Sequence, residues 1–239
     1  MIFNVPFDPF SQLAPRKTMK TIDPAIALRI AQRLCDRAGV ALILPTDLRR
    51  KAVIELVILA RDAAGDVDAK AVRDGTTVTL PGAPGAALTL LALVPVVGVA
   101  LVALSAPLGR TAIYLSPAAM RDGVLLLRTV WHELGHVGSI QRGGLGWCFA
   151  YLIAAEVRAG GEAPCYGAGM AVAVVLGADV DQVADEAKRS LQGYALDAPA
   201  KALAEGLIDS NRETLRATGD LGGIRAEVVA ELAVEGIRL

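Results

Sequence analysis

The chain has 239 residues, of which 54% are hydrophobic, and a formal net charge of −1. A net charge so close to zero argues against a nucleic-acid partner, because nucleic-acid binding usually requires a basic surface. The length suits one large domain or two small ones with a real hydrophobic core. Three cysteines without a C-x-x-C pair argue against a disulfide framework and are typical of a reducing compartment.

Residues 1–22 are predicted to form an extended N-terminal arm. Pro6 and Pro9 interrupt its apolar positions, and its basic residues follow those positions, which is the reverse of the order in a signal peptide. We therefore expect no signal peptide and a cytoplasmic protein. The three phenylalanines of the arm are expected to dock either on the chain's own body or on a protein partner.

Residues 23–110 predict an N-terminal α/β part. A helix is expected over 23–39, because an Asp-Pro pair is typical of a helix start and glycine of a helix end. A short buried strand is expected at 40–45, and a hairpin is expected around 74–75, where Asp-Gly favours a tight turn.

The segment 86–104 has 19 residues, and one threonine is its only polar side chain. That length and purity meet the criterion for a membrane span. The alternative is a pair of buried strands or a core helix in a protein rich in alanine and valine. Charges of both signs flank the segment, so they do not decide between membrane contact and burial.

Residues 111–239 predict a catalytic part followed by a C-terminal helical region. We expect a strand at 111–116, a helix at 124–138, a loop at 143–146 and a second helix at 147–159. About three amphipathic helices follow from residue 178 onward, and their charged residues are expected to face solvent. The predicted fold class is α+β and predominantly helical.

Both histidines of the chain lie in the motif H-E-L-G-H at 132–136. On a helix, His132 and His136 lie about one turn apart on one face, so both can bind one zinc ion. Glu133 is displaced around the helix and is predicted to act as general base, taking a proton from a zinc-activated water. The alternative is a pair of surface histidines beside a solvated glutamate.

A catalytic zinc ion needs a third protein ligand and an open fourth position. Because no histidine remains, the third ligand is expected to be a carboxylate or, less favoured, the thiolate of Cys148 or Cys165. Glu156 is preferred to Glu162, because Glu156 lies in an apolar predicted helix where an unpaired charge is costly. Glu162 lies in a polar, loop-like stretch, where a solvated carboxylate is expected. The alternative role for Glu156 is an ion pair with a neighbouring arginine.

These motifs resemble the gluzincins, the zinc metallopeptidases typified by thermolysin, over residues 111–160. The likeness rests on the HExxH motif, on the 20-residue step from His136 to Glu156, and on the E-V-R-A sequence at Glu156. It implies a zincin-like core with zinc ligands and a general base at His132, His136, Glu156 and Glu133. It also implies that the strand at 111–116 is the edge strand along which an extended peptide substrate aligns.

The chain departs from that pattern in two places. Thermolysin-like enzymes have an aspartate four residues after the ligand glutamate, and Gly160 occupies that position here. Their oxyanion-stabilising histidine is absent, and Tyr166, Tyr194 and Arg158 are the candidates to replace it.

Three functions follow from the sequence. The favoured one is a zinc-dependent metallopeptidase that acts on a peptide or protein substrate. The second is a membrane-associated HExxH peptidase anchored through 86–104. The third is a non-catalytic structural or assembly protein of a larger particle that retains a zinc site, with Cys148 or Cys165 as fourth ligand.

Overall fold

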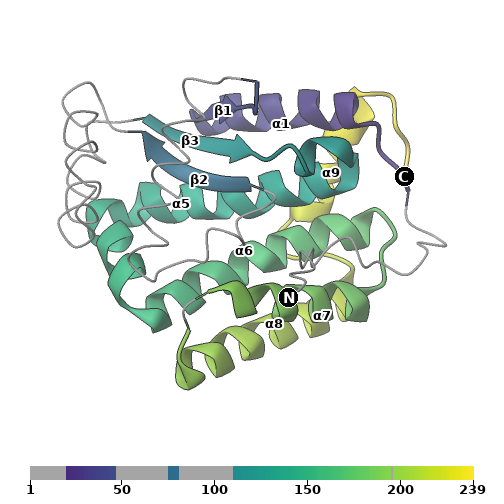
Figure 1. Cartoon of the computed structure of the whole chain (residues 1–239). Helices are drawn as coiled ribbons and strands as arrows, with labels where there is room; N and C mark the ends of the chain where they lie inside the picture. Colours follow the sequence, from purple (N-terminus) through teal and green to yellow (C-terminus); the bar gives the residue numbers. More distant parts are fainter. Residues whose placement is uncertain (1–19, 47–74, 81–109, 195) are drawn as a thin grey trace, which may run out of the picture.

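The computed structural model describes residues 20–46, 75–80, 110–194 and 196–239 of the chain. These residues form mostly helices together with a small sheet (Figure 1), which confirms the expectation of a predominantly helical α+β protein. The segment 86–104 and most of the N-terminal arm lie outside the described residues. Within the described part of the chain, no helix combines the length and the apolar character needed to cross a membrane.

The sheet has three strands in the order β1-β3-β2, namely β1 (Ala41–Ile43), β2 (Gly75–Leu80) and β3 (Arg110–Leu115). β1 runs parallel to β3 and β2 runs antiparallel to it, so Ile113 of β3 is paired with Leu42 on one side and Thr77 on the other. β3 is therefore the central strand, and the expectation that 111–116 forms an edge strand is wrong. Residues 112–114 of β3 pair with a strand on each side, so this part of its backbone is not open to an extended peptide.

Helix α1 (Pro24–Ala38) has the start and the end that the sequence predicts. The Asp23 side chain accepts a hydrogen bond from the backbone N–H of Ala25, and Gly39 ends the helix in the left-handed conformation with φ 68°. The buried residues of α1 are Ala27, Ile30, Ala31, Leu34 and Cys35. They pack in one hydrophobic core with β3 and with the helix that carries the histidines.

Helix α5 (Gly123–Ile153) carries both histidines and is kinked at Gly144. Its N-cap is Asp122, whose side chain accepts hydrogen bonds from the backbone N–H groups of Val124 and of the next residue. Gly144 has φ 56° and ψ −147°, a conformation that is essentially confined to glycine, and it divides α5 into two legs. The sequence predicts a loop at 143–146, and the structure has a sharp kink there instead.

Helix α6 (Ala155–Val175) begins where the predicted helix over 147–159 is interrupted. Ala154 has extended backbone angles, φ −114° and ψ 115°, so the chain changes direction before α6 starts. α6 approaches α5 closely, because a Cβ atom on Gly135 would lie only 2.7 Å from Sγ of Cys165. The absence of a side chain at one glycine therefore sets how closely the two helices pack.

The other helices in the described residues are α7 (Val180–Ser190), α8 (Ala198–Thr218) and α9 (Ile224–Val234), and two short 3-10 turns lie at Ala119–Arg121 and Leu191–Gly193. Figure 1 shows the helices in layers, with α5 next to the sheet, α6 against α5, and α7 and α8 beyond α6. Helix α6 contributes to two hydrophobic cores. Met170 and Ala171 pack with α7 and α8, whereas Val172 and Leu176 pack with α1, α5 and β3.

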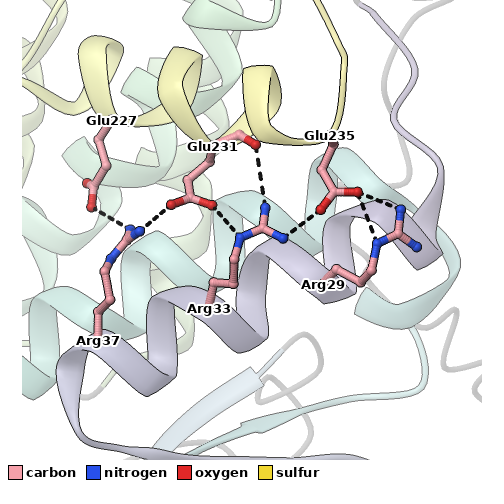
Figure 2. A network of polar contacts seen from close by, with 6 residues as sticks. All are labelled: Arg29, Arg33, Arg37, Glu227, Glu231 and Glu235. Carbon is pink, nitrogen blue, oxygen red and sulfur yellow. Dashed lines mark hydrogen bonds and ion pairs between the residues drawn. The ribbon is translucent and has the colours of Figure 1, made fainter.

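Three arginines of α1 form a ladder of ion pairs with two glutamates of α9 and the glutamate that directly follows it. We call this ladder the clasp: Arg29, Arg33, Arg37, Glu227, Glu231 and Glu235 (Figure 2). Glu235 lies 2.6 Å from Arg29 and 2.6 Å from Arg33, and Arg33 lies 3.0 Å from Glu231. A spacing of four residues on both helices places the charged groups on facing sides. The clasp therefore joins α1 to α9.

Two glutamates of the C-terminal helices are buried. Glu231 is 5% exposed, and Glu186 of α7 is 1% exposed and lies 3.2 Å from the guanidinium of Arg128 on α5. The expectation that the charged residues of this region face solvent is wrong for these two. Each is paired with arginine, as a buried carboxylate requires.

Candidate metal centre

The two histidines and one glutamate meet where α5 and α6 pack together. The Nε2 atoms of His132 and His136 lie 3.2 Å apart. Oε1 of Glu162 lies 3.3 Å from Nε2 of His136, and Oε2 lies 3.5 Å from Nε2 of His132. One ligand atom from each of the three residues lies within 4.8 Å of the other two, so the three form a group that could hold a metal ion.

The third member of this group is Glu162, whereas the sequence favours Glu156. Glu156 is exposed in the first turn of α6, and Glu162 is 1% exposed. Both premises of the preference for Glu156 are wrong. The helix restarts at Ala155, so Glu156 lies at a helix end and not inside an apolar helix. The stretch around Glu162 is helical despite Pro164, which lies inside α6. Six positions along a helix also turn the two carboxylates to different faces.

Glu162 has the surroundings of a metal ligand. Its Oε2 atom is buried and accepts no hydrogen bond from any residue that the structure describes. Burial by itself raises the pKa of the Glu162 carboxyl, but the imidazoles of His136 and His132 outweigh it and hold the pKa well below its usual value. An ionised, buried carboxylate beside two imidazole nitrogens fits a divalent cation, because the cation supplies the charge and the bonds that the oxygen lacks.

Glu133 and the cysteines stay outside the three-residue group. Glu133 directly follows His132 and is 5% exposed. Burial raises the pKa of the Cys165 thiol, and the Glu133 carboxylate adds to that shift, so Glu133 lies near the group without belonging to it. The charge of His136 opposes this shift and lowers the pKa of the Cys165 thiol, so Cys165 also lies near the group. Three ligands with a glutamate beside them are typical of catalytic metal sites, whereas structural zinc sites have four protein ligands.

Four aromatic side chains surround the group. The Tyr166 ring stands edge-on to that of His132 with a centroid distance of 4.7 Å, and the Tyr194 ring lies 6.4 Å from that of Tyr166. The rings of Trp147 and Tyr151 lie 6.3 Å and 6.0 Å from the ring of the second histidine. Tyr166 therefore lies against the first imidazole, Trp147 and Tyr151 lie near the second, and Tyr194 lies behind Tyr166.

Of the three candidates for oxyanion stabilisation, Tyr166 and Tyr194 lie near the group, and Arg158 contacts the backbone of Tyr151. Tyr166 lies four residues after Glu162. If Glu162 is the ligand glutamate, Tyr166 and not Gly160 occupies the position where thermolysin-like enzymes have an aspartate. Burial, followed by the charge of Glu162, raises the pKa of Tyr194 well above its usual value, so its phenol stays protonated at neutral pH. Arg158 is buried and donates a hydrogen bond to the backbone carbonyl of Tyr151 at 2.8 Å.

Sequence reasoning missed Trp147 and Tyr151. The signal available was their spacing of four residues, which places two aromatic rings on one face of the helix after the HExxH motif. Their rings lie 5.1 Å apart. The kink at Gly144 that turns this face toward the histidines has no comparable signal, because two glycines in a row also suit a loop.

Comparisons of the chain with protein-family models, with curated proteins and with solved structures found no match. The chemistry of the centre therefore has to be inferred from its own residues.

Proposed function

We propose that the protein is a zinc-dependent metallopeptidase with His132, His136 and Glu162 as metal ligands and Glu133 as general base. The observation behind this proposal is the donor set: two imidazoles and one buried carboxylate converge within 4.8 Å, and neither Glu133 nor a cysteine belongs to the group. Two histidines and one glutamate are a known ligand set of zinc peptidases. The ligand glutamate lies 26 positions after His136 and not 20, so the proposed relation to gluzincins does not include the thermolysin-like spacing.

Each residue of the centre has a defined task in peptide hydrolysis. Zinc, when bound, supplies a Lewis acid that polarises the scissile carbonyl and makes water acidic. Glu133 accepts the proton of the attacking water while the water oxygen bonds to the carbonyl carbon. Glu133 then donates that proton to the nitrogen as the C–N bond breaks, so the amine leaves neutral. The phenols of Tyr166 and Tyr194 are the proposed donors to the carbonyl oxygen.

The test of this proposal measures zinc content and peptide cleavage on the same samples. The purified chain is expected to hold about one zinc ion and to cleave members of a quenched fluorescent peptide library. Glu133→Gln is expected to keep the zinc and to lower cleavage by at least about 10²-fold, the usual contribution of a general base. A wild-type chain that holds zinc and cleaves no peptide would contradict the proposal and favour a non-catalytic assembly protein.

A membrane-associated form of the same enzyme is the second candidate, because the 19 residues of 86–104 carry only one polar side chain. Carbonate extraction of the membrane fraction distinguishes the two forms. Recovery of the chain in the carbonate wash would reject an anchor and favour a cytoplasmic enzyme. Retention in the membrane pellet would favour the membrane-associated form.

A further inference from the structure

We infer that Tyr151 is a positioning residue of the metal centre and that the kink at Gly144 delivers it to Glu162. The second leg of α5, residues 145–153, is called the returning leg here. The inference rests on the proposed metal site and adds a part of the chain that lies outside the HExxH motif. One helix thus supplies the two histidines from its first leg and the support of the third proposed ligand from its second.

The first observation is the contact itself. The phenol of Tyr151 is buried and donates a hydrogen bond to Oε1 of Glu162. The same oxygen lies 3.3 Å from Nε2 of His136, whereas Oε2 accepts no hydrogen bond from the described residues. A hydrogen bond to one oxygen fixes the rotation of the carboxylate and leaves the other oxygen free to bind a cation. Outer partners of this kind hold a ligand in the orientation that the metal requires.

The second observation is that α6 is shaped to receive the returning leg. A Cβ atom on Gly161 would lie 3.2 Å from Cζ2 of Trp147 and 3.4 Å from Cδ2 of Tyr151, so both rings lie directly over a glycine. Arg158 donates its hydrogen bond to the Tyr151 carbonyl from the preceding turn of α6. Gly161 immediately precedes Glu162, so the residue against which the returning leg packs is the chain neighbour of the proposed ligand.

The third observation is the backbone of Gly144. Its φ of 56° with ψ −147° lies in a region essentially limited to glycine, and any other residue there would be strained. Without this conformation α5 would continue straight and carry Tyr151 away from α6. Gly146, two residues later, does not have a positive φ, and a Cβ atom added to it would meet no atom within 4 Å. The two glycines thus differ in the property that the inference requires.

The experiment measures zinc affinity by competition with a chromogenic chelator, and it uses no peptide. Tyr151→Phe keeps the ring and removes only the hydroxyl, and is expected to weaken zinc binding about 10- to 100-fold, the usual effect of losing an outer partner. It should also shift the visible absorption of the cobalt-substituted protein, which reports ligand geometry. Tyr114→Phe, which removes the hydroxyl of a buried tyrosine in β3, is the matched control and should change neither.

The kink is tested in parallel with Gly144→Ala and Gly146→Ala. Gly144→Ala is expected to weaken zinc binding, Gly146→Ala to leave it unchanged, and Gly144→Ala with Tyr151→Phe to lose little more than Gly144→Ala alone. Wild-type zinc affinity in Tyr151→Phe would overturn the inference while leaving the proposed function intact. Failure of the wild-type chain to bind zinc would overturn both. Zinc binding without hydrolysis would overturn only the proposed function.

Discussion

Trp131 donates a hydrogen bond from its indole Nε1 to Oε2 of Glu227 at a distance of 3.1 Å. Trp131 directly precedes His132, so α9 contacts α5 one residue away from a proposed metal ligand. Glu227 also lies 3.4 Å from Arg37 of α1 and belongs to the clasp. The first and last helices of the described chain are thereby joined to the helix that carries the HExxH motif, and the stability of the centre is expected to depend on α9.

Replacing Glu231 by glutamine should destabilise the fold. The Glu231 side chain is 6% exposed and accepts hydrogen bonds from Arg33 and Arg37. The substitution removes its charge from both contacts, and we expect a loss of about 1–2 kcal/mol in the free energy of unfolding, because both arginines remain partly hydrated. Urea unfolding measures this. Glu213→Gln, in an exposed pair with Arg216, is the control and should change stability little; equal losses in the two variants would contradict the assignment.

The clasp should also make stability depend on pH. Hydrogen bonds from Arg29 and then Arg33 lower the pKa of Glu235. A lowered pKa in the folded state means that the contribution is fully present above the unfolded pKa, about 4.3, and is lost as the pH falls through the folded pKa. The difference in melting temperature between the wild-type chain and Glu235→Gln should therefore be largest near neutral pH and vanish in acid. A difference independent of pH would show that the Glu235 charge contributes nothing.

Glu162 and Glu156 form a matched pair for testing the third ligand. Glu162→Gln is expected to weaken zinc binding by more than about 100-fold, beyond the effect of losing an outer partner, because it removes a charged ligand atom. Glu156→Gln should bind zinc as the wild type does, because Glu156 is exposed and outside the group. Equilibrium dialysis against zinc measures both. The reverse result would restore Glu156 as the ligand and reject the centre described above.

The close approach of α5 and α6 can be tested at a glycine. Gly135→Ala would place a Cβ atom 2.7 Å from Sγ of Cys165 and should destabilise the fold by about 1–3 kcal/mol. Gly160→Ala, where nothing lies within 4 Å, should stabilise α6 by about 0.5–1 kcal/mol. Thermal and urea unfolding compare the two. Cys165→Ala added to Gly135→Ala should recover part of the loss, and a purely additive double variant would indicate that the sulfur is not the obstacle.

The local part of the centre is predictable from sequence, whereas its third ligand is not. His132, Glu133 and His136 lie within five residues of one helix, so helical periodicity alone places them. The choice between Glu156 and Glu162 depends on where a new helix begins. No helix-breaking residue marks the start of α6 at Ala155, because the one proline nearby lies inside α6. We attribute this start to the packing of α6 against α5.

The pairing of strands and the burial of charges were also beyond the sequence. The strand at 111–116 is predicted within one residue, but its central place in the sheet depends on β2, which is 30 or more residues away in the chain. The sequence around Glu231 has the pattern of a solvated helix face. Glu231 is buried because Arg33 and Arg37 of α1 pair with it. Contacts between distant segments decide both features, and a pattern within a single segment does not contain them.

Because α6 packs into two hydrophobic cores, we expect the stability of the fold not to depend on a bound metal ion. Helix α6 contributes to both hydrophobic cores, so we expect its amide protons to be among the slowly exchanging ones of the described chain. A chelator should therefore remove zinc and leave the circular dichroism of the chain intact, in contrast to small zinc domains that unfold without their ion. We therefore expect the polypeptide to fold without the metal, so that zinc can leave and return without refolding of the chain.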